Sequence, residues 1–316
     1  MKRGGEKIIH EIMKSPLVWV KAARFKLHTI GILPVLVGSL IGFNRTGDLK
    51  VANLAFAEMI ALFVLIATAF GNDYADAETD SLNRGFNMFS GGSRVIPEGL
   101  ITTQQMLVAT AMASASSIIL SIVFILFLKG HLFVLILNII GILIGVGYSL
   151  PPFRINYRGF GELLVMLMYG PFSVFFGYTT QLGLVIDAKV LYLSLIPALA
   201  AFLMILVTEI PDTATDRISG KKTIPSVFGE KAALIIYALG VVILYASVQL
   251  LYTKNVIGKI AFSVLLLSLP LGAYLVVMSL SKKSRVPKRI LSLCASTFIL
   301  TVWVNVVLSI DLVLNS

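Results

Sequence analysis

Long apolar stretches alternate with short polar segments along the whole chain. Nine of these stretches are long enough, at about 17 to 25 residues, to cross the hydrocarbon core of a bilayer as helices. They lack the strict alternation of apolar and polar residues that a lipid-facing β-barrel requires. The pattern therefore predicts an all-α transmembrane protein. The nine predicted helices are 27–43, 51–71, 104–128, 131–150, 161–183, 188–208, 231–252, 258–281 and 290–313.

The composition agrees with a membrane protein and excludes a soluble one. Hydrophobic residues make up 57% of the 316 positions and charged residues only 13%, against roughly 25% charged in soluble domains. The net charge of +10 does not indicate a nucleic-acid partner, because the basic residues are separated by apolar stretches instead of forming one basic surface. No linker or change of composition divides the chain, so we expect a single transmembrane domain over 1–316.

Lys and Arg are distributed unevenly over the polar segments. With a cytosolic N-terminus, 20 of the 26 fall on the cytosolic side, where membrane proteins retain positive charge. The distribution predicts a cytosolic N-terminus and an external C-terminus. Residues 1–26 are basic and amphipathic and carry no signal-peptide cleavage pattern, so we expect this segment to lie along the membrane interface.

Acidic residues concentrate in two polar segments that this topology places in the cytosol, and the first is 72–103. At about 100° per residue, Asn72, Asp76 and Asp80 fall within about 80° on one face of a helix. Asp73 lies at the edge of that face. The first segment thus carries a strip of carboxylate and amide oxygens.

The second acidic segment, 209–230, repeats this arrangement. Glu209, Asp212 and Asp216 fall within about 60° of one another on a helix. Pro211 disfavours helical geometry in the residue before it and has no N–H to donate. We therefore predict Asp212 and Asp216 as metal ligands. Whether Glu209 is also a metal ligand stays open.

Two facing strips of carboxylates repel each other unless cations lie between them. Oxygen ligands without histidine or cysteine suit Mg²⁺, which binds few protein groups and prefers phosphate oxygens. The sequence therefore predicts a Mg²⁺ and diphosphate site beside apolar helices, which favours an isoprenoid diphosphate. The alternative is that each strip is a solvated helix end whose acids offset the helix dipole. The predicted metal ligands are Asn72, Asp73, Asp76, Asp80, Asp212 and Asp216.

The two acidic patterns, N-D-x-x-D-x-x-x-D at 72–80 and D-x-x-x-D at 212–216, resemble those of the UbiA superfamily of intramembrane prenyltransferases. The resemblance covers nearly the whole chain. It implies a UbiA-like helical bundle and Mg²⁺-dependent transfer of a prenyl chain from an allylic diphosphate to an acceptor, with Asp76 and Asp212 as catalytic residues. Further matching segments are KAARFKLHT around Arg24, YSLPPFR at 148–154, GFGELLVMLMYGP at 159–171 and DRISGKKTIP at 216–225.

Basic residues in the polar segments are candidates to bind the diphosphate. A diphosphate with Mg²⁺ still needs hydrogen-bond donors for its remaining oxygens, and the glycine-rich stretch after the first acidic strip could close over it. The alternative is that these charges only orient the chain in the membrane. The candidates are Arg84, Arg94, Arg154, Lys221 and Lys222.

Three other residues have predicted roles. By resemblance, Arg24 is a candidate to orient an acidic acceptor. Tyr148 heads the YSLPPFR segment and is a catalytic candidate, with an interfacial aromatic anchor as the alternative. Glu58 is the only acid well inside a predicted helix, and we expect it to make a structural hydrogen bond.

The acceptor is inferred from resemblance alone. SGGSRVIPEGLIT at 90–102 and MYGPFSVFFGYTTQLG at 168–183 are similar to loops of the branch that prenylates 1,4-dihydroxy-2-naphthoate in menaquinone synthesis. This implies an aromatic acceptor and a prokaryotic cell membrane, with the site facing the cytosol. Other acceptors remain open: 4-hydroxybenzoate, homogentisate or an archaeal glycerol-phosphate ether lipid. A non-catalytic isoprenoid carrier is the alternative of another class, although transporters usually bind their substrates near the midplane.

Overall fold

The computed structural model describes residues 16–83, 85–281 and 285–316. These residues form helices and turns, and within them the only extended pairing is one bridge between Asn87 and Ser90. The predicted all-α class is confirmed. Arg84 and most of the amphipathic segment lie outside the described residues, and α2 (Pro16–Ala23) represents the end of that segment.

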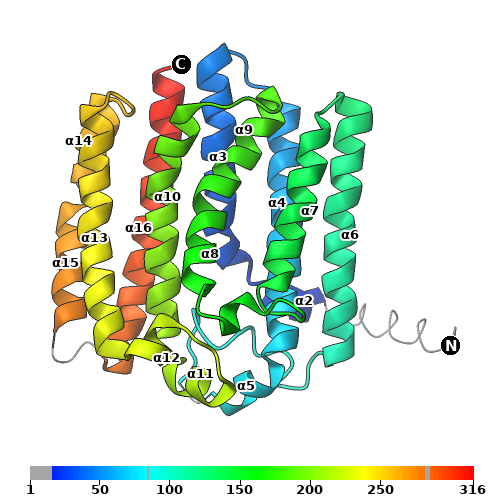
Figure 1. Cartoon of the computed structure of the whole chain (residues 1–316), viewed down its shortest axis with the longest axis vertical. Coiled ribbons are helices and arrows are strands. Elements are labelled where there is room, and N and C mark those ends of the chain that lie inside the picture. The colour runs from blue at the N-terminus through cyan, green and yellow to red at the C-terminus, as the bar shows by residue number, and fades with distance from the viewer. Residues whose placement is uncertain (1–15, 84, 282–284) are drawn as a thin grey trace, which may run out of the picture.

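The helices run side by side along the long axis of the molecule (Figure 1). In the described part of the chain, seven are long and apolar enough to cross a membrane, and a bent pair makes a possible eighth. The protein is therefore an integral, multi-pass membrane protein. The seven are α3 (Phe25–Thr46), α4 (Val51–Ala75), α6 (Thr103–Leu128), the continuous stretch Gly161–Leu182, α10 (Ala188–Glu209), α13 (Glu230–Thr253) and α16 (Pro287–Leu314).

Two of the nine predicted helices fall short of a simple span. α7 (Leu132–Gly147) has 16 residues and is about 24 Å long, less than the roughly 30 Å of a bilayer core. The predicted helix 258–281 is divided into α14 (Lys259–Leu266) and α15 (Leu269–Leu280), which meet at 41°. Nine spans therefore stay a prediction.

The predicted helix 161–183 is present but changes its geometry halfway. It consists of α8 (Gly161–Leu167), the π-helical turn η2 (Met168–Phe172) and α9 (Ser173–Leu182). Pro171 lies inside the turn and has no N–H to donate, which accounts for the change of register. The Ser173 hydroxyl donates to the Met168 carbonyl at 2.7 Å and so satisfies one backbone acceptor.

Short helices gather at one end of the bundle, at the bottom of Figure 1, while the C-terminus lies at the other end. They are α5 (Ala77–Leu82), α11 (Thr213–Ser219) and α12 (Ile224–Phe228). α5 and α11 belong to the two acidic segments and contact each other. The fold thus brings the two segments together, as the sequence predicts.

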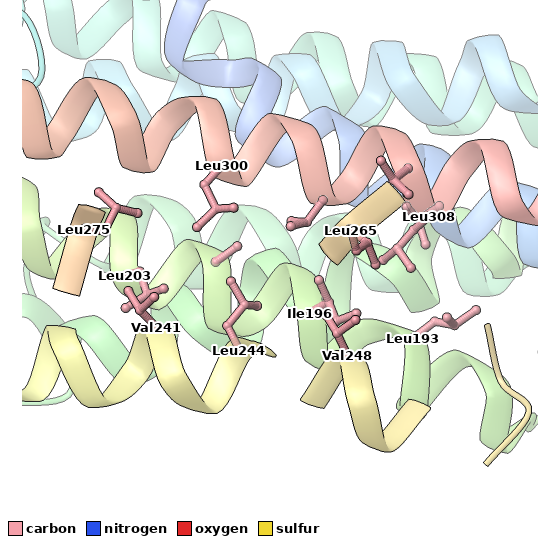
Figure 2. Close-up of a cluster of buried hydrophobic side chains, with 14 of the residues drawn as sticks. Leu193, Ile196, Leu203, Val241, Leu244, Val248, Leu265, Leu275, Leu300 and Leu308 are labelled. Carbon is pink, nitrogen blue, oxygen red and sulfur yellow. The ribbon is translucent and has the colours of Figure 1, made fainter. Parts of the chain in front are cut away.

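The largest buried cluster lies where α10, α13 and α16 pack together (Figure 2). Leu203 of α10, Leu244 of α13 and Leu300 of α16 are each at most 1% exposed. In lipid the hydrophobic effect hardly favours one helix contact over another, so close packing must hold these helices together. The cluster fixes α10, whose end carries the second acidic segment.

α3 and α9 approach closely at two glycines. A Cβ at Gly38 would overlap the Val174 carbonyl, and a Cβ at Gly177 would overlap the Val35 carbonyl. The Ser39 hydroxyl donates to the Gly177 carbonyl at 3.2 Å and reinforces the contact. Small residues of this kind allow transmembrane helix backbones to pack directly.

We expect Gly177→Ala to destabilise the protein by about 1 to 3 kcal/mol, because the added methyl group must displace backbone. Thermal unfolding in detergent measures the effect. Gly141→Ala is the control, since its nearest neighbour is the Phe172 ring at 3.4 Å and the helix gains a better former. Equal midpoints for the two variants would contradict the close approach of α3 and α9.

Candidate active site

The two acidic segments line one polar pocket of about 150 Å³ at the end of the bundle. Residues of α4 and α5 line the pocket from one side, and residues of α10 and α11 line it from the other. Its acidic and amide lining comprises Asn72, Asp76, Asp80, Asn83, Asn156, Glu209, Asp212 and Asp216.

The first segment does not form one continuous helix. α4 ends at Ala75, Asp76 occupies its C-cap, and α5 begins at the next residue. The Asp80 N–H nevertheless donates to the Asp76 carbonyl at 2.7 Å, so Asp76 and Asp80 remain one helical turn apart despite the break. The Asn72 amide donates to the Asp76 carboxylate at 2.9 Å. Asn72, Asp76 and Asp80 therefore line the same pocket, as their spacing predicts.

Pro211 interrupts the second segment, as expected from the sequence. α10 ends at Glu209 and α11 begins after Asp212. The Asp216 N–H donates to the Asp212 carbonyl at 2.8 Å and restores helical spacing between these two aspartates. Glu209, which the sequence left open, still lines the pocket from the last turn of α10.

Direct hydrogen bonds join the two segments at Asp212. The Asn83 side chain donates to one carboxylate oxygen of Asp212 at 2.7 Å. The Gly91 N–H donates to the other oxygen at 3.2 Å. Gly91 and Gly92 have φ values of 75° and 69°, a left-handed conformation that glycine adopts readily, and a Cβ at Gly92 would overlap the Asp80 carboxylate. These glycines allow the loop that contains them to pack against Asp80 of the first acidic segment and Asp212 of the second.

A lysine ammonium balances part of the negative charge. Lys221 donates to Asp76, which is only 2% exposed, and Tyr157 donates to the other oxygen of Asp76 at 3.4 Å. The backbone N–H of Lys221 donates to the Asp216 carbonyl at 2.9 Å, and the ammonium charge also acts on the Asp216 carboxylate, whose pKa burial raises and this charge lowers. One cation thus lies between the carboxylates contributed by α4 and those contributed by α11.

The donors suit Mg²⁺. Hard oxygens line the pocket, a protein cation already lies among them, and one Glu209 oxygen is buried without a hydrogen-bond partner in the described chain. No three carboxylate, imidazole or thiolate groups of the described residues form a preassembled ion site. Mg²⁺ binds through one or two carboxylates and completes its shell with water and phosphate oxygens, so oxygen donors of this kind would suffice to hold it.

Burial shifts the ionisation of the pocket aspartates. Burial raises the pKa of Asp80 to about 7, and the charges of Asp76 and Asp73 add to the shift. Burial also raises the pKa of Asp216 to about 7, with Lys221 opposing the shift and Asp212 adding to it. Both groups bind protons in the folded protein at a pH where an unfolded chain would have released them.

An apolar cavity of about 300 Å³ adjoins the polar pocket. Along α4 it extends from Asn72 to Ile60, which is about 18 Å at 1.5 Å per residue. Its walls come from α3, α4, α7, α10 and the stretch around η2. The residues shared by the pocket and the cavity are Arg24, Asn72, Phe89, Tyr148, Ile205 and Thr208.

Arg24 and Tyr148 lie at this junction. The Arg24 guanidinium donates to Asp73 at 3.1 Å, while its Nε is buried without a partner in the described chain. Gly161 lies against the Tyr148 hydroxyl, and a Cβ there would come within 3.0 Å of it. Both predicted residues therefore border the polar pocket and the apolar cavity.

Several predicted residues lie outside the pocket lining. Asp73 is 4% exposed and accepts hydrogen bonds from Arg24 and from the backbone and hydroxyl of Ser93, so its oxygens are already engaged. Arg94 donates to the Asp80 carbonyl and stacks 4.4 Å from the Phe86 ring.

The remaining basic candidates differ in position. Arg154 stacks over Tyr157 at 5.3 Å, and Lys222 is exposed. Among the basic residues predicted to bind the diphosphate, Lys221 lines the pocket in the described chain, and Arg84 lies outside the described residues.

The structure adds residues that the sequence did not single out. Asn83, Asn156 and Tyr157 line the pocket or bond to its aspartates. The short polar loop that follows Tyr148 was a usable signal for the last two, because it lies between two apolar helices on the side of both acidic segments.

The prediction for Glu58 is wrong. Neither of its carboxylate oxygens has a hydrogen-bond partner among the described residues, although both are buried. The residue lies in the first half of α4, far along the helix from the Asn72 end. Sequence alone does not show whether a facing helix offers a donor.

The fold and the site define a multi-pass helical membrane protein that carries facing carboxylates beside an apolar cavity. Residues 31–304 match the UbiA prenyltransferase family, and the chain belongs to this family. The named relatives are prenyltransferases, and so is this protein.

Relatives with different acceptors are similar to the chain. It is 23% identical to 2-carboxy-1,4-naphthoquinone phytyltransferase of Synechocystis sp. over 228 residues, 72% of this chain and 71% of that protein. It is 26% identical to 1,4-dihydroxy-2-naphthoate octaprenyltransferase of Bacillus subtilis over 219 residues, 69% and 68% of the two chains. It is 27% identical to digeranylgeranylglyceryl phosphate synthase of Methanosphaera stadtmanae over 266 residues, 81% and 86%.

Solved structures share the fold. A UbiA homolog from Aeropyrum pernix K1 has a TM-score of 0.67 at 18% identity and covers 91% of this chain and 97% of that one. A UbiA homolog from Archaeoglobus fulgidus, bound to DMAPP and Mg²⁺, has a TM-score of 0.62 at 16% identity and covers 92% and 99%. At these identities the likeness shows the fold alone.

The raised pKa values of Asp80 and Asp216 predict a pH-dependent response to Mg²⁺. Because the folded state holds protons that the unfolded state releases between about pH 4 and 7, the metal-free protein should lose stability as pH rises through that window. Mg²⁺ requires ionised carboxylates, so it should raise the unfolding midpoint more at about pH 8 than at about pH 6. Thermal unfolding with and without Mg²⁺ measures this. Asp216→Asn should flatten the metal-free pH dependence, whereas the exposed Asp48→Asn should not.

Proposed function

We propose that this prenyltransferase uses Mg²⁺ to transfer a polyprenyl chain from an allylic diphosphate to an aromatic acceptor. The observation that carries the proposal is the shared lining of the polar pocket and the apolar cavity. A charged diphosphate and its hydrocarbon chain need two such environments in direct contact. The alternative is that each acidic strip is only a solvated helix end. Such a helix end would not require an adjoining apolar cavity.

The metal ligands we propose are Asn72, Asp76, Asp80, Asp212 and Asp216. When bound there, Mg²⁺ would supply positive charge to stabilise the diphosphate as the allylic C–O bond breaks. Lys221 lines the pocket beside Asp76 and would donate to a diphosphate oxygen there. The apolar walls of the cavity would exclude water, so that the allylic carbon reacts with the acceptor instead of with water.

We propose 1,4-dihydroxy-2-naphthoate as the acceptor. Two relatives named for naphthoate or naphthoquinone substrates support this choice, while the similar digeranylgeranylglyceryl phosphate synthase supports a glycerol-phosphate acceptor. The position of Arg24 at the junction of pocket and cavity favours an acid, because its Nε has no partner within the part of the chain that the structure describes. A guanidinium is well suited to bind a carboxylate there.

We further propose that the chain is a single domain of a prokaryotic cell membrane and that the pocket faces the cytosol. The uneven distribution of Lys and Arg supports this orientation. A carrier of isoprenoid lipids is less consistent with the pocket. Residues of α5 and α11 line it, and these helices lie at one end of the bundle instead of near its middle (Figure 1).

We expect Asp76→Ala and Asp212→Ala each to lower the transfer rate by at least about 10²-fold, because each removes charge stabilisation at the leaving group. Purified protein, Mg²⁺ and a labelled prenyl diphosphate with an aromatic acceptor provide the assay, and EDTA should stop the wild type reversibly. Asp48→Ala, at an exposed site, is the matched control. Full turnover without divalent metal would refute the proposed chemistry.

With equal concentrations of both acceptors, 1,4-dihydroxy-2-naphthoate should be prenylated with a higher kcat/KM than 4-hydroxybenzoate. Arg24→Gln should raise the KM for the acid more than the KM for the prenyl diphosphate, because the charge it removes faces the acceptor. Preference for 4-hydroxybenzoate, or product only with a glycerol phosphate ether, would assign the protein to another branch of the family.

A further inference from the structure

His28 lies in the wall of the apolar cavity, one helical turn from Arg24. The cavity-lining positions of α3 include Leu27, His28, Gly31 and Val35, which recur at helical spacing and form one face of the helix, and Arg24 lines the cavity from the N-cap position of α3. His28 is near the middle of this face and is only 6% exposed. The three histidines of the sequence share no ligand spacing, so the sequence predicts no metal site at His28.

The imidazole has an unused nitrogen. Its Nε2 is buried and has no hydrogen-bond partner among the described residues. In the neutral tautomer that carries its proton on Nδ1, the other ring nitrogen is an acceptor. In the neutral ring this leaves Nε2 with a free lone pair, able to accept a proton.

A purely structural role explains the ring less well. The Phe25 ring packs edge-on against it with centroids 6.2 Å apart, and an apolar ring would make that contact equally well. Buried polar atoms normally find a partner, and an exception calls for a ligand or another explanation. The prenyl chain that the cavity would hold has no polar group to pair with this nitrogen, so its partner would be the acceptor, whose carboxylate Arg24 would bind nearby.

We infer that His28 binds a ring hydroxyl of the aromatic acceptor and takes up its proton during prenyl transfer. The hydroxyl proton moves to Nε2, and the oxygen electrons increase the electron density of the ring. A ring carbon then forms the bond to C1 of the prenyl chain, while the C1–O bond breaks and its electron pair leaves with the diphosphate. That carbon is the one that carries the acceptor's carboxylate, which leaves as carbon dioxide; its bonding electrons return to the ring, and His28 returns the proton to the oxygen.

This inference rests on the proposed function, and acceptor-independent solvolysis of the prenyl diphosphate separates the two. His28→Phe keeps a ring against Phe25 but removes both nitrogens. We expect it to lower kcat/KM for the acceptor by at least about 10²-fold and to remove the acidic limb of its pH profile. Mg²⁺-dependent solvolysis and the KM for the prenyl diphosphate should stay unchanged.

Two further variants complete the test. His28→Ala should regain transfer activity when imidazole is added, because the base can enter the space that the side chain leaves. His131→Phe, at the N-cap of α7 and outside the cavity lining, should behave as wild type.

The outcomes are distinguishable. Wild-type transfer by His28→Phe, no rescue of His28→Ala by imidazole, or equal loss of transfer and solvolysis would each overturn the role of His28. Absence of Mg²⁺-dependent solvolysis in the wild type would instead contradict the proposed function itself.

Discussion

The carboxylates of Asp76, Asp212 and Asp216 come from two helix ends and share one buried pocket, where like charges repel each other strongly. Lys221 and Asn83 offset part of that repulsion by bonding to Asp76 and Asp212. The long helices must still hold both ends in place, because separation would relieve the repulsion. Packing of α10 against α13 and α16, and of α4 against α6, supplies this restraint.

The same restraint permits a polar site in a membrane protein. Charge interactions are stronger beside low-dielectric walls than in water, so a few well-placed groups can stabilise a leaving diphosphate. Irregular backbone is tolerated at membrane depth where it lines a cavity or is buried in protein. The π-helical turn η2 follows this rule, because Met168, Tyr169 and Phe172 line the apolar cavity. Its departure from α-helical geometry contributes to the chamber beside the polar pocket.

Local patterns predicted the helices well and their irregularities poorly. Hydrophobic length identified α4, α6 and α10 within a few residues, because each is set by the continuous apolar run that lipid requires. The sequence analysis predicted neither the bend between α14 and α15 nor the turn at Pro171, because hydropathy carries no information on backbone geometry. For Pro211 the local rule sufficed: α10 ends at Glu209, just before it.

The sequence by itself determined the membrane class, the all-helical fold and the grouping of acids into two segments, because each follows from composition or from spacing along one helix. Only the tertiary structure decided which of those groups face a common space. In the folded protein Asp73 bonds to Arg24 and Ser93, Lys221 lies between the two acidic strips, and the Nε2 of His28 has no partner among the described residues. These outcomes depend on contacts between helices distant in sequence, and no local pattern encodes which side chain a distant helix will present.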